Sequence, residues 1–196
     1  MISTGNLTSR DTYDYLRHLA SDVHVVKGEF DENNSFPESK VVTVGNFQIG
    51  VIHGHSVVPW GDHEALAAVQ RRLDVDILVF GHTHEYEAFE YEGKLFVNPG
   101  SITGAYSPVT DDVTPSFVLM KVSGSTVTCY IYHIVDDKVT IEKVVHRKGG
   151  GEDDDEDDED EYEEEYEEDD EDDDEDVDDE DDEGEEDDEG EDEDDE

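Results

Sequence analysis

Two histidines separated by one residue, His82 and His84, follow an apolar run of strand length. A second pair with the same spacing, His53 and His55, follows another apolar run. Neutral imidazole is a common ligand for zinc, manganese and iron. Open α/β sheets place ligands just beyond the carboxyl ends of their strands, so two such strand ends would bring these imidazoles to one point. From these residues alone, a metal site and a set of hydrogen-bonded structural histidines are equally good interpretations.

The surrounding sequence alternates strand and helix signals in its first half and is nearly all strand in its second half. A capping pattern at Thr8-Ser9 predicts one helix, and Asp62 predicts the start of another. We expect strands over residues 23–26, 40–44, 47–52, 76–80, 86–91, 94–98, 116–122, 126–135 and 138–146. This order predicts an α/β fold, a sandwich of two packed sheets with flanking helices.

The charge of the chain is concentrated at one end. The 196 residues carry a formal net charge of −48, and residues 152–196 hold 40 of the 60 acidic residues and no Lys or Arg. Such a segment cannot bury enough apolar surface to offset its ordering entropy. We therefore predict one folded domain over residues 1–148. A glycine hinge and a disordered poly-Asp/Glu tail follow over 149–196.

The remaining composition indicates a cytoplasmic location. The chain has one cysteine, Cys129, which excludes an internal disulfide and fits a reducing compartment. It shows no secretory signal and no apolar run near the ~20 residues that a membrane span needs.

The motifs resemble those of a known enzyme family. The segments HGH (53–55), GHTH (81–84) and NPGS (98–101) resemble the calcineurin-like metallophosphoesterases. Five ordered blocks mark that family: D-x-H, G-D-x-x-D, G-N-H-[DE], a His, and G-H-x-H. The longer segments TGNLTSRDTYDYL, DVHVVKGEFDEN and DVDILVFGHTHEYEAFE narrow the resemblance to the phosphoesterase-fold subunit of retromer, over nearly all of 1–148. The resemblance implies a metallophosphoesterase-like fold whose first strand, which ends in D-x-H, is missing here.

The resemblance also implies a metal site that has lost its catalytic groups. The implied ligands of one divalent metal, zinc or manganese, are Asn6, Glu29, His53, His82 and His84. Asn6 stands where the enzymes have the Asp that bridges two metals, and Phe30 replaces a His that donates a proton. We therefore expect no catalysis.

Two partner surfaces follow from the same resemblance. The first would bind the large α-solenoid subunit of retromer through Val57, Val58, Pro59 and Trp60, unless Trp60 packs inward. The second would bind endosomal regulators at an apolar patch of Leu119, Tyr130, Tyr132 and Ile141, which ordinary sheet packing also explains. The implied function is a non-catalytic scaffold in endosomal cargo retrieval and retrograde transport to the Golgi, on the endosome membrane only through its partners.

Three other interpretations stay open at this point. The chain would be a metal-dependent phosphodiesterase if its metal pocket still hydrolyses phosphoesters. It would be an interaction protein led by its acidic tail if that tail captures a basic protein; the tail would repel nucleic acid. It would be a fragment unable to fold alone if the missing strand is essential, and we expect an apolar strand ending in D-x-H ahead of Met1.

Overall fold

The computed structural model describes residues 1–32, 35–107, 109–135 and 138–149. The chain divides into two units, Met1–Asp154 and Asp155–Glu196, and every described residue belongs to the first. The predicted acidic tail and most of the glycine hinge lie outside the described residues, so the predictions made for them stay predictions.

Two helices form where the capping residues predict them. In α1 (Arg10–Leu19), the Ser9 hydroxyl accepts a hydrogen bond from the Thr12 N–H at 3.1 Å. In α2 (His63–Leu73), the Asp62 carboxylate accepts one from the Ala65 N–H at 2.8 Å. Each cap satisfies an N–H that has no partner within its own helix. Neither helix is long and apolar enough to cross a membrane.

A five-stranded sheet forms the centre of the domain. Its spatial order is β3-β4-β5-β7-β6. The middle strands β4, β5 and β7 run parallel, whereas β3 and β6 pair antiparallel at the two edges. The bounds are β3 (Ser39–Val44), β4 (Phe47–Ile52), β5 (Ile77–Val79), β6 (Tyr86–Tyr91) and β7 (Lys94–Pro99). The buried middle of this sheet explains why the sequence of β5 is apolar without alternation.

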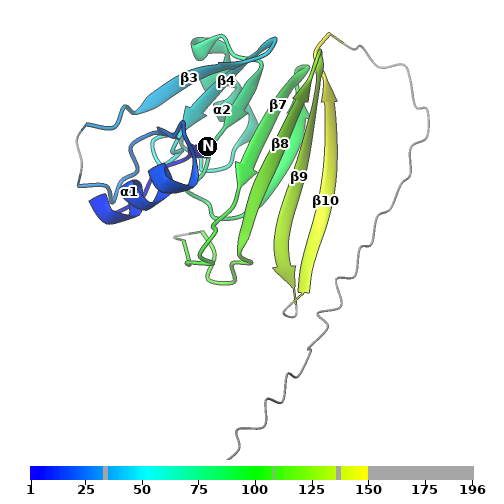
Figure 1. The fold of residues 1–196 in the computed structure, drawn as a ribbon. Helices are drawn as coiled ribbons and strands as arrows, with labels where there is room; N and C mark the ends of the chain where they lie inside the picture. The colour runs from blue at the N-terminus through cyan, green and yellow to red at the C-terminus, as the bar shows by residue number, and fades with distance from the viewer. Residues whose placement is uncertain (33–34, 108, 136–137, 150–196) are drawn as a thin grey trace, which may run out of the picture. The chain divides into compact units, whose positions relative to one another are not determined.

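Two smaller sheets accompany the central one. An antiparallel meander has the order β10-β9-β8, formed by β8 (Ser116–Ser123), β9 (Thr126–Val135) and β10 (Lys138–Arg147), and Figure 1 shows these long strands side by side. A parallel pair joins β1 (Ile2–Ser3) to β2 (His24–Val25).

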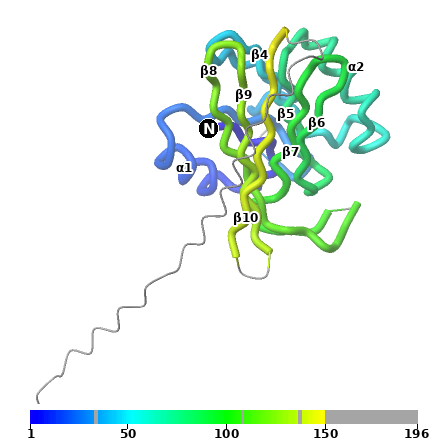
Figure 2. The backbone as a smooth tube through the Cα atoms, turned by 90° about the vertical axis from the view of Figure 1, so that its right-hand side faces the viewer, coloured from blue at the N-terminus to red at the C-terminus, as the bar shows by residue number. Residues whose placement is uncertain are grey.

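Apolar side chains cover both faces of the five-stranded sheet. On one face, Phe47 and Ile49 pack with Val127 and Cys129 of β9 in one core cluster. On the other face, Leu78, Phe80 and Phe96 pack with α2 residues such as Leu66 in a second cluster. Figure 2 shows the resulting layers, with the five-stranded sheet between β8–β10 and α2. The predicted α/β sandwich is therefore confirmed.

The inward-facing side chains of β8 are less deeply buried than those of the neighbouring strand β9. The inward-facing Val118, Met120 and Val122 of β8 remain half-buried, whereas Val127 and Cys129 of β9 are 0% exposed. Both β8 and β1 end their sheets, and side chains of both pack on the same core cluster. The further strand expected ahead of Met1 stays a prediction.

We predict that truncating Leu66 to Ala lowers the free energy of unfolding by about 2–4 kcal/mol, because it opens a cavity beneath α2. Leu66 is 1% exposed. Chemical denaturation of the full chain measures the loss. The matched control is Leu19→Ala on α1, where the side chain is 57% exposed and the expected cost is below about 1 kcal/mol. Equal losses at the two positions would contradict this view of the core.

Candidate metal centre

The carboxyl ends of β4 and β5 bring His53 and His82 together. Val51 pairs with Val79 in the parallel register, and the Gly81 N–H donates to the His53 carbonyl oxygen at 2.9 Å. The centroids of the two imidazole rings lie 5.5 Å apart. His53 and His82 are 4% and 3% exposed, so both rings are held in the interior at the edge of the sheet.

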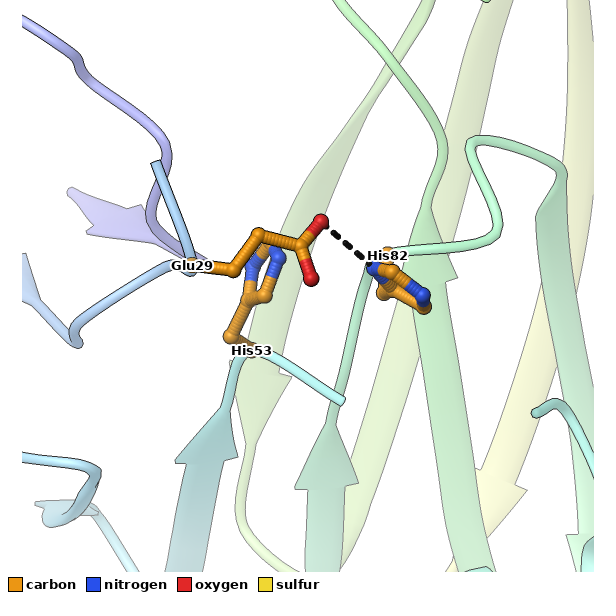
Figure 3. A group of neighbouring side chains, drawn as sticks. All are labelled: Glu29, His53 and His82. Atoms are coloured by element: carbon orange, nitrogen blue, oxygen red, sulfur yellow. Dashed lines mark ion pairs between the residues drawn. The ribbon is translucent and has the colours of Figure 1, made fainter. Parts of the chain in front are cut away.

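Glu29 completes a group of three metal-ligand side chains (Figure 3). It lies in the loop after β2, and its Oε1 is 3.2 Å from Nδ1 of His82. One ligand atom from each of Glu29, His53 and His82 falls within 4.8 Å of the others. A carboxylate and two imidazoles form a donor set that suits zinc or another transition metal, and three protein ligands leave a position open.

The hydrogen bonds of the two imidazoles leave nitrogens free for a metal. His53 Nδ1 is 2.7 Å from the carbonyl oxygen of Thr4, and because a carbonyl only accepts, Nδ1 carries the proton. His53 Nε2 is then unprotonated and faces the Asn6 amide nitrogen at 3.3 Å. Both ring nitrogens of His82 are buried without a hydrogen-bond partner in the described part of the chain, and Nδ1 is the one that faces Glu29 Oε1, at 3.2 Å. An unsatisfied ring nitrogen in the interior is costly unless a ligand binds it, so the residues fit a metal ion.

Burial keeps both imidazoles in the ligating form. Desolvation lowers the pKa of His53 below its ordinary value of 6.5, and the hydrogen bond to Thr4 opposes this only in part. Desolvation also lowers the pKa of His82, against the raising effect of Glu29. Neutral imidazole is the form that binds metals, so the site is ready for a cation at neutral pH.

Asp31 holds the loops that carry Asn6 and Glu29. Its carboxylate accepts hydrogen bonds from the N–H groups of Asn6, Thr8 and Gly28 at 2.8–2.9 Å. Asn6 and Thr8 both have positive φ, 58° and 60°, a conformation that costs non-glycine residues energy. Asp31 was not predicted as a site residue, although it occupies the acidic position of the G-N-H-[DE] block.

The structure does not bring every predicted ligand into the cluster. His84 lies outside it, and its Nδ1 donates to the Ala105 carbonyl oxygen at 2.6 Å. Asn6 borders the cluster through His53. His55 was not among the implied metal ligands, yet its ring centroid lies 5.2 Å from that of His53 and 6.4 Å from that of His82. The HGH spacing was the available signal for it.

Comparison with known proteins identifies relatives for most of the chain. A family model described as a calcineurin-like phosphoesterase superfamily domain matches residues 1–125. The chain is 48% identical over 152 residues to vacuolar protein sorting-associated protein 29 of Schizosaccharomyces pombe. That match covers 76% of this chain and 81% of the relative.

Solved structures of similar proteins have the same fold. Wild-type Vps29 of Entamoeba histolytica complexed with Zn²⁺ is 56% identical, with a TM-score of 0.71 and coverage of 74% of this chain and 80% of that one. Vacuolar protein sorting 29 of Cryptosporidium parvum is 43% identical, with a TM-score of 0.71 and the same coverage of both chains.

We predict that zinc affinity is constant above about pH 7 and falls as the pH drops below 6.5, because protons then compete with the metal for His53 and His82. The sign follows from the lowered pKa of both rings, which stay neutral until the solution is more acidic than their ordinary value. Calorimetric titration of the full chain with zinc across this pH range measures the effect.

The control for this pH profile is His63→Gln. His63 is an exposed histidine on α2 that stacks on Phe89 and lies outside the ligand cluster. This variant should keep the wild-type profile, whereas His82→Gln should bind zinc weakly at every pH. Zinc binding by His82→Gln as tight as that of the wild-type chain would contradict histidine ligation.

Proposed function

Because this chain belongs to the calcineurin-like phosphoesterase superfamily and, within it, to the family of vacuolar protein sorting-associated protein 29, we propose that it is a non-catalytic scaffold subunit of retromer. In this role it binds the large α-solenoid subunit and acts in endosomal cargo retrieval and retrograde transport to the Golgi. It works in the cytoplasm and reaches the endosome membrane only through its partners.

We propose that the cluster binds one divalent metal, with zinc as the first choice. The Entamoeba relative is described in complex with Zn²⁺, and this chain offers a carboxylate and two neutral imidazoles. Glu29, His53 and His82 would hold the ion. Asn6 would ligate it only after its amide turns, because its Nδ2 now faces His53 Nε2 and its Oδ1 accepts a hydrogen bond from the Phe30 N–H at 3.0 Å. The ion would be a structural element that satisfies the buried ring nitrogen of His82.

The side chains around the cluster support a role without hydrolysis. The Asn6 amide brings no negative charge to hold a second dication. Phe30 is 65% exposed, and its phenyl ring cannot donate a proton to a leaving group. His84 is bound to the Ala105 carbonyl oxygen rather than to the cluster.

The observation that carries the scaffold proposal is an exposed apolar loop tip directly above the ligand cluster. Val58 is 74% exposed and Trp60 is 44% exposed, and Pro59 between them is also exposed. Exposed apolar side chains that cluster on one loop indicate a protein interface. Val57 is 9% exposed and packs in the core beneath α2, so we assign it a supporting role in the docking loop, residues 57–60.

The regulator patch is the second proposed interface, formed by Leu119, Tyr130, Tyr132 and Ile141. Leu119 pairs with Tyr130 across β8 and β9, and Ile141 pairs with Tyr132 across β10 and β9, so all four share the outer face of the meander. Leu119 and Ile141 are 54% and 43% exposed. Phe117 stacks on Tyr132 with the ring centroids 4.8 Å apart and extends the patch. Sequence reasoning had not singled out Phe117.

We predict that Val58→Asp weakens binding of the purified large retromer subunit at least about tenfold, because the carboxylate would be desolvated in the interface. Leu119→Asp should leave that binding unchanged within about twofold. Leu119 is exposed on a different element, which makes it a matched control for an apolar-to-acidic change at the surface. Calorimetry or surface plasmon resonance with the full chain provides the affinities.

For a peptide that binds the regulator patch, we expect the opposite effects of the same two substitutions. Leu119→Asp should abolish its binding, and Val58→Asp should leave it unchanged. If neither substitution alters the affinity of either partner, the scaffold proposal fails. If both substitutions weaken both partners equally, the two surfaces are not separate.

A further inference from the structure

Trp60 contacts both the metal cluster and the solvent-exposed side of the docking loop. Its ring centroid lies 4.5 Å from that of His82, and the two ring planes meet at 73°. This is an edge-to-face contact, the geometry that aromatic pairs prefer. His82 is 3% exposed while Trp60 is 44% exposed, so one side of the indole covers the metal ligand and another side faces solvent.

The indole is held in place by the segment that follows the HGH motif. The Trp60 Nε1–H donates to the carbonyl oxygen of His55 at 3.0 Å. Gly61 has a φ of +73°, which lets the chain turn directly after Trp60, and a Cβ added at this position would contact the Thr83 side chain. The docking loop therefore rests on the turn that carries His82 and Thr83.

We propose that Trp60 is a positioning residue for the metal site and that it couples metal binding at His82 to docking of the large subunit on loop 57–60. This inference rests on the proposed function above, since it needs both a metal and a docking partner. Trp60 acts through His82 and is not itself a ligand.

Two physical effects make zinc binding strengthen the docking of the large subunit. A bound metal ion withdraws electrons from the imidazole, and this strengthens the contact when the imidazole presents its edge to the face of the indole. Metal binding also fixes the orientation of the His82 ring, which orders the indole packed against it. A partner that binds the exposed side of Trp60 then encounters an ordered loop and loses less entropy on docking.

The coupling between zinc binding and docking of the large subunit acts in both directions. If zinc raises the affinity for the partner by a given factor, the partner raises the affinity for zinc by the same factor. Loss of the indole should weaken zinc binding and should also remove the effect of zinc on docking. An isolated edge-to-face pair contributes about 0.5–1.5 kcal/mol, which corresponds to about a two- to tenfold change in affinity.

The first experiment is a calorimetric titration of the full chain with zinc chloride. We expect Trp60→Leu to raise the dissociation constant for zinc by about two- to tenfold, and Trp60→Phe, which restores an aromatic ring, to recover most of the affinity. The control is Leu19→Ala, at a comparably exposed position on α1 outside both proposed interfaces, which should bind zinc like the wild-type chain. Thermal unfolding in EDTA checks that the three variants are folded.

The fluorescence of Trp60 gives a readout that a general loss of stability would not produce. Trp60 is the only tryptophan of the chain, so its emission reports this contact alone. Zinc should change the emission of the wild-type chain and of Leu19→Ala, with half-saturation at the zinc concentration found by calorimetry. No change in emission at saturating zinc would overturn the inference.

The last experiment measures docking of the large subunit in zinc and in EDTA. Zinc should tighten docking of the wild-type chain by about two- to tenfold and have no effect on Trp60→Leu. If the wild-type chain binds zinc but Trp60→Leu binds it equally well, the inference fails and the proposed function stands. If the wild-type chain binds no zinc, the metal part of the proposed function fails together with this inference.

Discussion

The parallel pairing of β4 with β5 fixes the metal cluster and the loop above it. The register that sets Val51 against Val79 places His53 and His82 at one edge of the sheet, and the hydrogen bond from Gly81 to His53 joins the two chain segments beyond the strands. Glu29 reaches the same point from the loop after β2. A one-residue slip in this pairing would move alternate side chains to the opposite face and separate the histidines.

The electrostatics of the cluster favour cation binding. Desolvation keeps the imidazoles of His53 and His82 neutral, and the carboxylate of Glu29 provides the negative charge next to them. Hydrolysis of a phosphoester would also need a second charged bridge between metals and a proton donor. Asn6 and Phe30 provide neither, which is the reason for proposing that the ion stabilises the loops beneath the proposed docking surface.

Strand ends and helix caps were predictable from the sequence because they depend on local patterns. Asp62 was predicted as a cap, and His53 and His82 were predicted to meet because parallel strands end at a common edge. The contacts of Asp31 with backbone N–H groups and of Trp60 with His82 were not predictable in this way. They join segments that are distant in sequence, and their side-chain directions depend on backbone turns with positive φ that no periodicity encodes.

The central claim is that this phosphoesterase fold holds a metal without using it for hydrolysis. Hydrolysis of bis(p-nitrophenyl) phosphate by the full chain, in the presence of zinc or manganese, tests this claim most directly. The predicted result is a rate equal to that of the metal-containing buffer, both for the wild-type chain and for His82→Ala. A metal-dependent rate well above the buffer that disappears in His82→Ala would contradict the claim and identify the cluster as an active site.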